Sequence, residues 1–215
     1  MRFKAVIFDM DGLLLDTERV AQEAGVEACA QMGLDVPYQF FVDQLMGKDH
    51  ETGAQLLRDF LGHDLDMDRL NTLWTIACDR RFENGVPLRP RAVEMLDLVD
   101  ALPLPKAIAT STQTKRAWEK LGQAGLDHRF DTLVGFNCIA NPKPAPDPYL
   151  EAASRLGHAP SDCIAFEDSE TGVRAALAAG MTVVQVPDMK PAPLGLAHFI
   201  ADDLIAGAQA AGLAP

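Results

Sequence analysis

A short apolar run near the start of the chain leads directly into two acidic residues. Residues Ala5 to Phe8 carry no polar side chain, and Asp9, Asp11 and Gly12 follow at once. Such a run is typical of a strand buried on both faces, as in the middle of a parallel sheet. Ligands of these sheets bind beyond the carboxyl ends of the strands, so we predict that Asp9 and Asp11 lie at the site-forming edge.

Two neighbouring carboxylates repel each other unless a cation lies between them. A hard divalent ion with oxygen ligands meets this need and leaves one carboxylate oxygen to attack an electrophile, so we predict a Mg²⁺ site. An isolated Asp-x-Asp pair would more often be a hydrated turn. Three further segments favour the functional interpretation.

From residue 87 onward, apolar runs alternate with helical patterns. The expected strands are 106–109, 132–135, 163–166 and 182–186, and the expected helices are 91–102, 115–124, 146–156 and 172–179. This alternation predicts an α/β fold with a doubly wound parallel sheet. The segment from Lys190 is rich in alanine, proline and glycine, and we expect a loosely ordered tail there.

Residues 17–84 interrupt this alternation with helical patterns only. An all-helical insertion directly after the first strand suits a cap over a site. We therefore predict an α/β catalytic core of residues 1–16 and 85–215 and a helical cap of residues 17–84. Met32, Trp74 and Phe82 recur at helical spacing, which indicates the interior of the cap and not a ligand platform.

Two later segments offer groups that bind anions. Thr110 and Ser111 follow the strand at 106–109, where a hydroxyl and backbone N–H groups can bind phosphate, although either residue could instead cap the next helix. Lys143 lies between Pro142 and Pro144, which restrict the loop, so its ammonium can be aimed at one point. The alternative for Lys143 is a solvated surface lysine.

The strand at 163–166 again ends in acids, Glu167 and Asp168. If this strand is adjacent to the first, Asp168 lies near Asp9, and both acids become candidate metal ligands. The alternative is that they complement the dipole of the following helix.

Composition narrows the class of protein. The formal net charge of −12 disfavours nucleic acid as a partner, because phosphate backbones require a basic face. There is no signal-peptide core and no apolar run of about 20 residues that could span a membrane, so we expect a cytoplasmic protein. The four cysteines are widely spaced and are expected to be buried thiols.

In their order and spacing, the four motifs resemble those of the haloacid dehalogenase superfamily, in particular helical-cap phosphatases similar to β-phosphoglucomutase. The resemblance covers essentially the whole chain. It implies that Asp9 is the nucleophile that forms an aspartyl-phosphate and that Asp11 is the general acid and base. The apolar neighbours Met10 and Leu13–Leu15 are expected to keep Asp11 protonated for the first step.

The resemblance also implies a set of binding residues. Phosphate would be bound by Gly12, Thr110, Ser111 and Lys143, and Mg²⁺ by Asp9, Glu167, Asp168 and the main-chain carbonyl of Asp11. In the cap, Gly47, Lys48 and His50 are candidates for substrate binding, and Met46, Arg80 and Arg81 could also project toward the pocket.

The family's dehalogenases lack the second acid, so Asp11 favours phosphoryl transfer. Its mutases carry a histidine where this chain has Ala21, which favours water as the acceptor. The expected activity is a Mg²⁺-dependent phosphohydrolase acting on a small phosphorylated metabolite such as a sugar phosphate, and the simplest expectation is a monomer. A mutase and a pyrophosphatase remain the enzymatic alternatives, and a regulatory module without turnover is the non-enzymatic one.

Overall fold

The computed structural model describes residues 2–45, 50–62, 64–189, 191–192 and 194–213. The chain divides into two compact units. One unit consists of Met1–Asp16 and Val86–Pro215, and the other of Thr17–Gly85.

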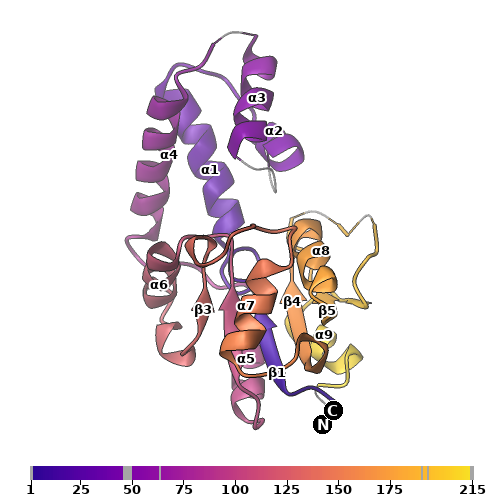
Figure 1. The fold of residues 1–215 in the computed structure, drawn as a ribbon. Coiled ribbons are helices and arrows are strands. Elements are labelled where there is room, and N and C mark those ends of the chain that lie inside the picture. The colour runs from indigo at the N-terminus through magenta and orange to yellow at the C-terminus, as the bar shows by residue number, and fades with distance from the viewer. Residues whose placement is uncertain (1, 46–49, 63, 190, 193, 214–215) are drawn as a thin grey trace. The chain divides into compact units, whose positions relative to one another are not determined.

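The first unit is built on a six-stranded sheet in the order β3-β2-β1-β4-β5-β6, in which every pair of neighbours is parallel. The arrowheads therefore point toward the same edge (Figure 1). The strands are β1 (Ala5–Phe8), β2 (Lys106–Ala109), β3 (Leu133–Val134), β4 (Cys163–Glu167), β5 (Thr182–Gln185) and β6 (Phe199–Ile200).

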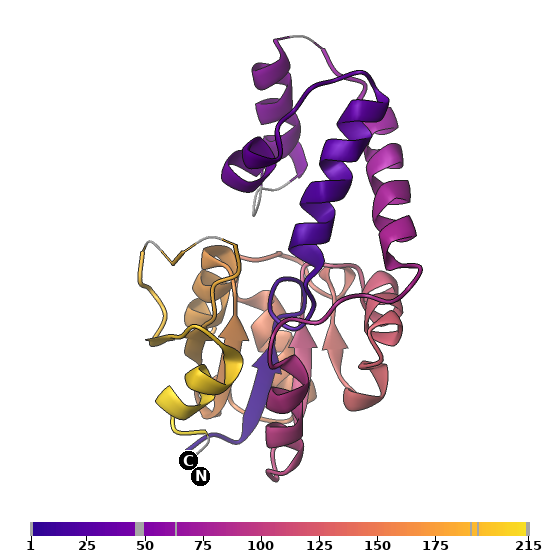
Figure 2. The same ribbon diagram turned by 180° about the vertical axis from the view of Figure 1, so that it is seen from behind.

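Helices cover both faces of this sheet, so the predicted doubly wound α/β fold is confirmed. α7 and α8 lie on one face, and α5 and α9 lie on the other (Figures 1 and 2). The helices are α5 (Ala92–Asp100), α6 (Thr114–Gln123), α7 (Asp147–Arg155), α8 (Glu170–Ala178) and α9 (Leu204–Ala210), with short 3-10 turns η2 (Asp127–Arg129), η3 (Phe136–Cys138) and η4 (Pro160–Asp162).

Strand β1 is fully buried because each of its faces meets a different layer. Ala5 and Ile7 belong to the cluster that includes Tyr149 of α7. Phe8 stacks on Phe166 of the neighbouring strand β4, with ring centroids 5.5 Å apart, and the Phe166 ring lies close to Gly207 of α9. This two-sided burial explains why the run is apolar without alternation.

The strand register brings the chemical groups to one level. Phe8 lies opposite Ile108 of β2 and Phe166 of β4. The residues that follow these three positions therefore meet at the carboxyl edge of the sheet.

The second unit consists, among its described residues, of helices: α1 (Thr17–Gln31), α2 (Tyr38–Phe40), the π-helical turn η1 (Phe41–Leu45), α3 (His50–Leu61) and α4 (Met67–Phe82). The indole N–H of Trp74 in α4 donates to the carbonyl of Ala21 in α1 at 2.7 Å. Met32 and Trp74 pack against the buried cluster of this unit, and Phe82 is buried. These three side chains are part of the interior, as predicted.

The expectation of a loosely ordered tail from Lys190 is wrong for residues 199–210, which form β6 and α9. Leu204, Ile205 and Ala208 are buried. Gly207 faces Val184 of β5 so closely that an added Cβ would lie 2.5 Å from Val184 Cγ1. Small residues thus allow α9 to approach the sheet, although they leave little hydrophobic periodicity in the sequence.

The cap at the N-terminus of α9 provides a test of how this helix is stabilised. Asp203 accepts hydrogen bonds from the N–H groups of Ile205 and Ala206 at 2.9 and 2.8 Å. The Ala206 N–H and the Arg91 guanidinium lower the pKa of Asp203 below its usual 3.8. The stabilisation is therefore complete above pH 3.8 and is lost as the pH falls through the lowered value.

We expect Asp203→Ala to lower the free energy of unfolding by about 1 kcal/mol at neutral pH, because a helix cap is lost. Urea unfolding at neutral pH and near pH 3 measures this, and the difference should shrink at acid pH. An equal difference at both values would contradict the assignment.

Within the described part of the chain, every helix is too short or too polar to cross a bilayer. The cysteines are unpaired thiols; Cys29 and Cys163 are buried, as expected, whereas Cys78 and Cys138 are only half-buried.

Candidate active site

The ammonium of Lys143 lies against the carboxylate of Asp9. Lys143 Nζ donates to Asp9 Oδ1 at 2.6 Å, and both side chains are less than a tenth exposed. Asp9 directly follows β1, and Lys143 is in the loop before α7. The structure thus joins two predicted site residues that are 134 positions apart in the sequence, and it excludes a solvated surface role for Lys143.

Glu167, the last residue of β4, holds the other side of this ammonium. Its Oε1 atom accepts from Lys143 Nζ at 2.5 Å and also from the hydroxyl of Tyr149, which is fully buried. Burial lowers the pKa of Lys143, but Asp9 and Glu167 together raise it above its usual value. Lys143 therefore keeps its positive charge inside the protein.

Gly172 makes room for the Glu167 carboxyl group. A Cβ atom at Gly172 would overlap the carboxyl group of Glu167. We expect Gly172→Ala to destabilise the protein by about 1–3 kcal/mol through overpacking and to lower activity by displacing Glu167 from Lys143.

Gly122→Ala in α6 is the matched control, since its Cβ would lie 3.8 Å from the nearest atom. It should be neutral or stabilise by up to about 1 kcal/mol. Thermal melts and initial rates compare the two variants. Equal melting temperatures and equal initial rates in the two variants would show that displacing Glu167 affects neither stability nor activity.

Three carboxylates at this edge could hold a metal ion. Among the described residues, one ligand atom each of Asp9, Glu167 and Asp168 lies within 4.8 Å of the others. Ser169 accepts the Gly172 N–H at 3.1 Å and thereby caps α8. Neither Glu167 nor Asp168 is therefore the capping residue of this helix. Lys143 contacts two of these acids, Asp9 and Glu167, and the all-oxygen donor set of the three carboxylates fits a divalent cation.

The electrostatics of Asp9 support the same fit. Burial raises the pKa of Asp9 to about 8, and Glu167 and Asp11 add to this rise while Lys143 opposes it. A divalent cation beside Asp9 would lower the pKa again and favour the carboxylate form.

Asp11 contacts a different set of residues. Its Oδ1 atom accepts from Lys120 Nζ at 2.6 Å, and its Oδ2 atom accepts from the Thr112 hydroxyl at 2.7 Å. The Thr110 hydroxyl is farther away, 3.5 Å from Oδ2. The expected apolar surroundings are therefore wrong for the carboxylate itself: Met10 is buried, but the carboxylate meets a cation and a hydroxyl.

Two residues that were predicted to bind phosphate, Gly12 and Ser111, have other settings in the structure. The N–H of Gly12, which has φ +84°, donates to the carbonyl of Leu15 at 2.8 Å, so in this structure Gly12 shapes the turn. Ser111 is exposed. Whether either residue also contacts a ligand stays a prediction.

Thr110 is buried at the end of β2, and its hydroxyl accepts the N–H of Thr112 at 3.1 Å. It does not cap α6, since the first N–H of that helix, from Thr114, donates to Asn137 Oδ1 at 2.8 Å. The alternative role for Thr110 as a helix cap is thereby excluded.

No contact among the described residues brings the predicted substrate-binding residues of the helical unit together in a site. Met46, Gly47 and Lys48 lie outside the described residues, and His50 is the first residue of α3. Arg80 and Arg81 form ion pairs with Glu27 of α1 at 2.6 and 2.7 Å. These two arginines therefore tie α4 to α1.

Sequence reasoning missed Tyr149 and Lys120 as members of the site. Tyr149 is carried by α7 and reaches Glu167, which no local pattern indicates. Lys120 gave a weak signal, because it follows the buried Ala117 by one helical turn. Its side chain leans toward the helix N-terminus, as helical side chains do, and so toward the carboxyl edge of the sheet.

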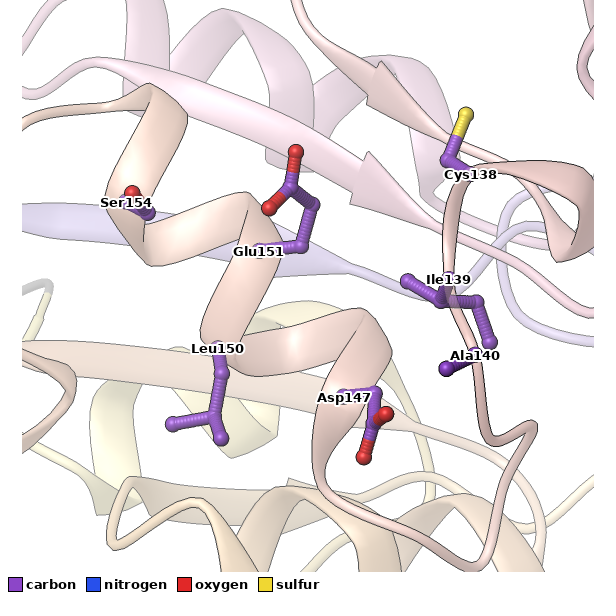
Figure 3. Close-up of a pocket in the computed structure, with 7 residues that line it drawn as sticks. All are labelled: Cys138, Ile139, Ala140, Asp147, Leu150, Glu151 and Ser154. Carbon is purple, nitrogen blue, oxygen red and sulfur yellow. The ribbon is translucent and has the colours of Figure 1, made fainter.

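A separate pocket of about 440 Å³ lies on α7 and shares no lining residue with these groups (Figure 3). Its lining includes the carboxylates of Asp147 and Glu151 and no cationic side chain. These charges would repel a phosphate ester, so this pocket is not the candidate active site.

A buried lysine lies among the acids around Asp9 at the carboxyl edge of a parallel sheet, which is where α/β enzymes bind their ligands. Comparison with known proteins places the chain more narrowly. The family model for haloacid dehalogenase-like hydrolases matches residues 6–186. The chain belongs to this family, which confirms the resemblance found in its motifs.

The chain is 35% identical over 190 residues to the fructose-1-phosphate phosphatase YqaB of Escherichia coli (strain K12), an alignment that covers 86% of this chain and 97% of that protein. It is 33% identical over 179 residues to a phosphorylated carbohydrates phosphatase of Thermotoga maritima, which covers 83% of this chain and 82% of that protein. A solved HAD family hydrolase from Deinococcus radiodurans R1, with bound phosphate and sodium, is 28% identical with a TM-score of 0.80, over 98% of this chain and 95% of that one.

Proposed function

We propose that this protein is a Mg²⁺-dependent phosphatase that releases phosphate from a small phosphorylated sugar through an aspartyl-phosphate on Asp9. The observation that carries the proposal is the Lys143–Asp9 contact of 2.6 Å beside Glu167 and Asp168. The names of the two phosphatase relatives support the substrate class.

In the first step, Asp9 Oδ attacks phosphorus and the bond to the leaving oxygen breaks. Asp11 gives its proton to that oxygen, and the sugar alcohol departs. In the second step, water attacks phosphorus, Asp11 accepts its proton, and Asp9 regains its carboxylate as inorganic phosphate leaves.

Lys143 and Thr110 supply positive charge and a hydroxyl for the phosphoryl oxygens. Lys143 also orients Asp9, since one ammonium bonds both Asp9 and Glu167. This preset geometry costs no reorganisation when charge moves onto the phosphoryl group.

Asp9 and Asp168 are the proposed metal ligands, with the main-chain carbonyl of Asp11. Glu167 is the other candidate, although its Oε1 atom already accepts two hydrogen bonds. When bound, Mg²⁺ would neutralise charge on the phosphoryl group and favour ionised Asp9.

The metal assignment is tested by removing one ligand. We expect Asp168→Asn to raise the Mg²⁺ concentration needed for half-maximal activity about tenfold or more, because a charged ligand is lost. Mg²⁺ titrations of phosphate release measure this, and EDTA should stop release by the unaltered protein. Asp162→Asn, a surface acid paired with Lys4, serves as the control. An unchanged Mg²⁺ requirement would mean that residues other than Asp168 bind the metal.

Several finer points remain proposals that rest on the sequence: that residues 17–84 act as the substrate-selecting cap, that the protein is a cytoplasmic monomer, and that nucleic acids and membranes are not partners. The charge of −12 supports the absence of nucleic acid.

The activity itself is tested by incubating purified protein with Mg²⁺ and a panel of fructose 1-phosphate, hexose 6-phosphates, glucose 1-phosphate and pyrophosphate. We expect phosphate release from one or more sugar phosphates. An isomerised sugar phosphate without released phosphate would indicate a mutase, and release from pyrophosphate alone would indicate a pyrophosphatase.

A further inference from the structure

The two acids of the Asp9-x-Asp11 motif are engaged on opposite sides of β1. Asp9 meets Lys143 and lies within the acidic group completed by Glu167 and Asp168 from the β4 side. Asp11 instead meets Thr112 and Lys120, which follow β2. Since β1 lies between β2 and β4, neighbouring carboxylates point to different partners.

Both oxygens of Asp11 are held. Lys120 Nζ lies 2.6 Å from Oδ1, and the Thr112 hydroxyl lies 2.7 Å from Oδ2. The Lys120 and Asp11 side chains are only 15% and 19% exposed, so water screens this pair less than a surface pair. Two bonds from different directions fix the rotation of the carboxylate, which one bond alone would not do.

Packing of α6 does not require Lys120. The helix buries Ala117 and Leu121, and its other cationic side chains are more exposed than Lys120, with Lys115 at 91% and Arg116 at 35%. Lys120 departs from this pattern because its ammonium turns toward Asp11. A flexible lysine loses rotamer entropy in such a place, which points to a role beyond helix stability.

We propose that Lys120 is a positioning residue for Asp11. Together with Thr112 it holds the Asp11 carboxyl group on the β2 side, away from the group of acids that suits a cation. This inference rests on the proposed function, in which Asp11 exchanges a proton with the leaving oxygen. A carboxylate drawn to a bound metal could not make that exchange, so the separation preserves the acid–base role.

The proposal is tested by the leaving-group dependence of Lys120→Met. A sugar alkoxide needs a proton to depart, whereas p-nitrophenolate does not. We expect kcat/KM to fall about 10–100-fold for the sugar phosphate and less than about threefold for p-nitrophenyl phosphate. Lys120→Arg should restore part of the loss, and Lys115→Met in the same helix should leave both rates unchanged.

A double substitution separates positioning from general damage. In an Asp11→Asn background, Lys120→Met should cause no further loss, because its target is gone. Equal losses on both esters, or an additive loss in the double variant, would overturn the proposal and indicate substrate contact or misfolding.

If the unaltered protein releases no phosphate from any ester, the proposed function fails, and the positioning role is judged by structure. Crystals of the unaltered protein and of Lys120→Met, both grown with Mg²⁺, provide that measurement. The Asp11 carboxylate should stay on Thr112 in the first and leave it in the second. An Asp11 that is unmoved by the substitution would overturn the inference without reference to activity.

Discussion

Replacing Asp9 with asparagine should abolish phosphate release, with a loss in kcat/KM of about a thousandfold or more. The amide keeps the shape of the side chain and can still accept a hydrogen bond from Lys143, but it cannot form the aspartyl-phosphate. Initial rates with the best sugar phosphate from the panel measure the loss. Circular dichroism should show an unchanged fold, because the substitution removes a buried charge and creates no cavity.

A surface acid of the same type is the control for Asp9→Asn. Asp97 has a side chain that is 65% exposed and pairs with Arg129, so Asp97→Asn should keep the full rate. Activity above about a tenth of the original in Asp9→Asn would contradict nucleophilic attack by this carboxylate. Direct attack by water would then be the better mechanism.

The strands were predictable because the sheet is buried on both faces. Each central strand must then be a short apolar run, and this holds for all of β1, for β2 after Lys106 and for β4 up to Glu167. The C-terminal β6 and α9 were missed for the opposite reason. Their burial depends on a close approach of Gly207 to Val184, and this tertiary contact leaves no local period in the sequence.

The same distinction holds for the candidate site. Asp9, Thr110 and Asp168 follow strand ends, and parallel pairing alone places strand ends together. Lys120 and Tyr149 instead act from helices, where the rotation of the helix and the reach of a side chain decide the partner. The surroundings of Asp11 were misjudged because its sequence neighbours are apolar, whereas its spatial neighbours are not.

The second large effect is expected from Lys143→Met, which leaves Asp9 and Glu167 without their shared ammonium. Both carboxylates are almost fully buried, with side-chain exposures of 9% and 0%. Removing one partner of a buried ion pair typically costs about 3–5 kcal/mol, since the remaining charge is uncompensated. Turnover should also fall about a thousandfold, because phosphoryl oxygens and Asp9 lose their cation.

The loss of stability in Lys143→Met should depend on pH in a defined direction. Asp9 already has a pKa raised to about 8 by burial, and the loss of Lys143 removes the opposing influence. The folded variant therefore binds a proton that the unfolded chain, with a carboxyl pKa near 3.8, does not bind. Below about pH 8 the folded unaltered protein also binds this proton, so the destabilisation should stay constant there and should grow as the pH rises above about 8, where Asp9 ionises only in the protein that keeps Lys143.

Urea unfolding of the metal-free protein at several pH values measures this dependence, and activity is assayed at a temperature where circular dichroism shows the variant folded. Lys4→Met is the matched control, because Lys4 is 60% exposed and pairs with Asp162 on the surface. It should cost less than about 1 kcal/mol at every pH. If Lys143→Met were as stable and as active as this control, the buried lysine would not be the counter-charge of Asp9, and the proposed chemistry would lose its central contact.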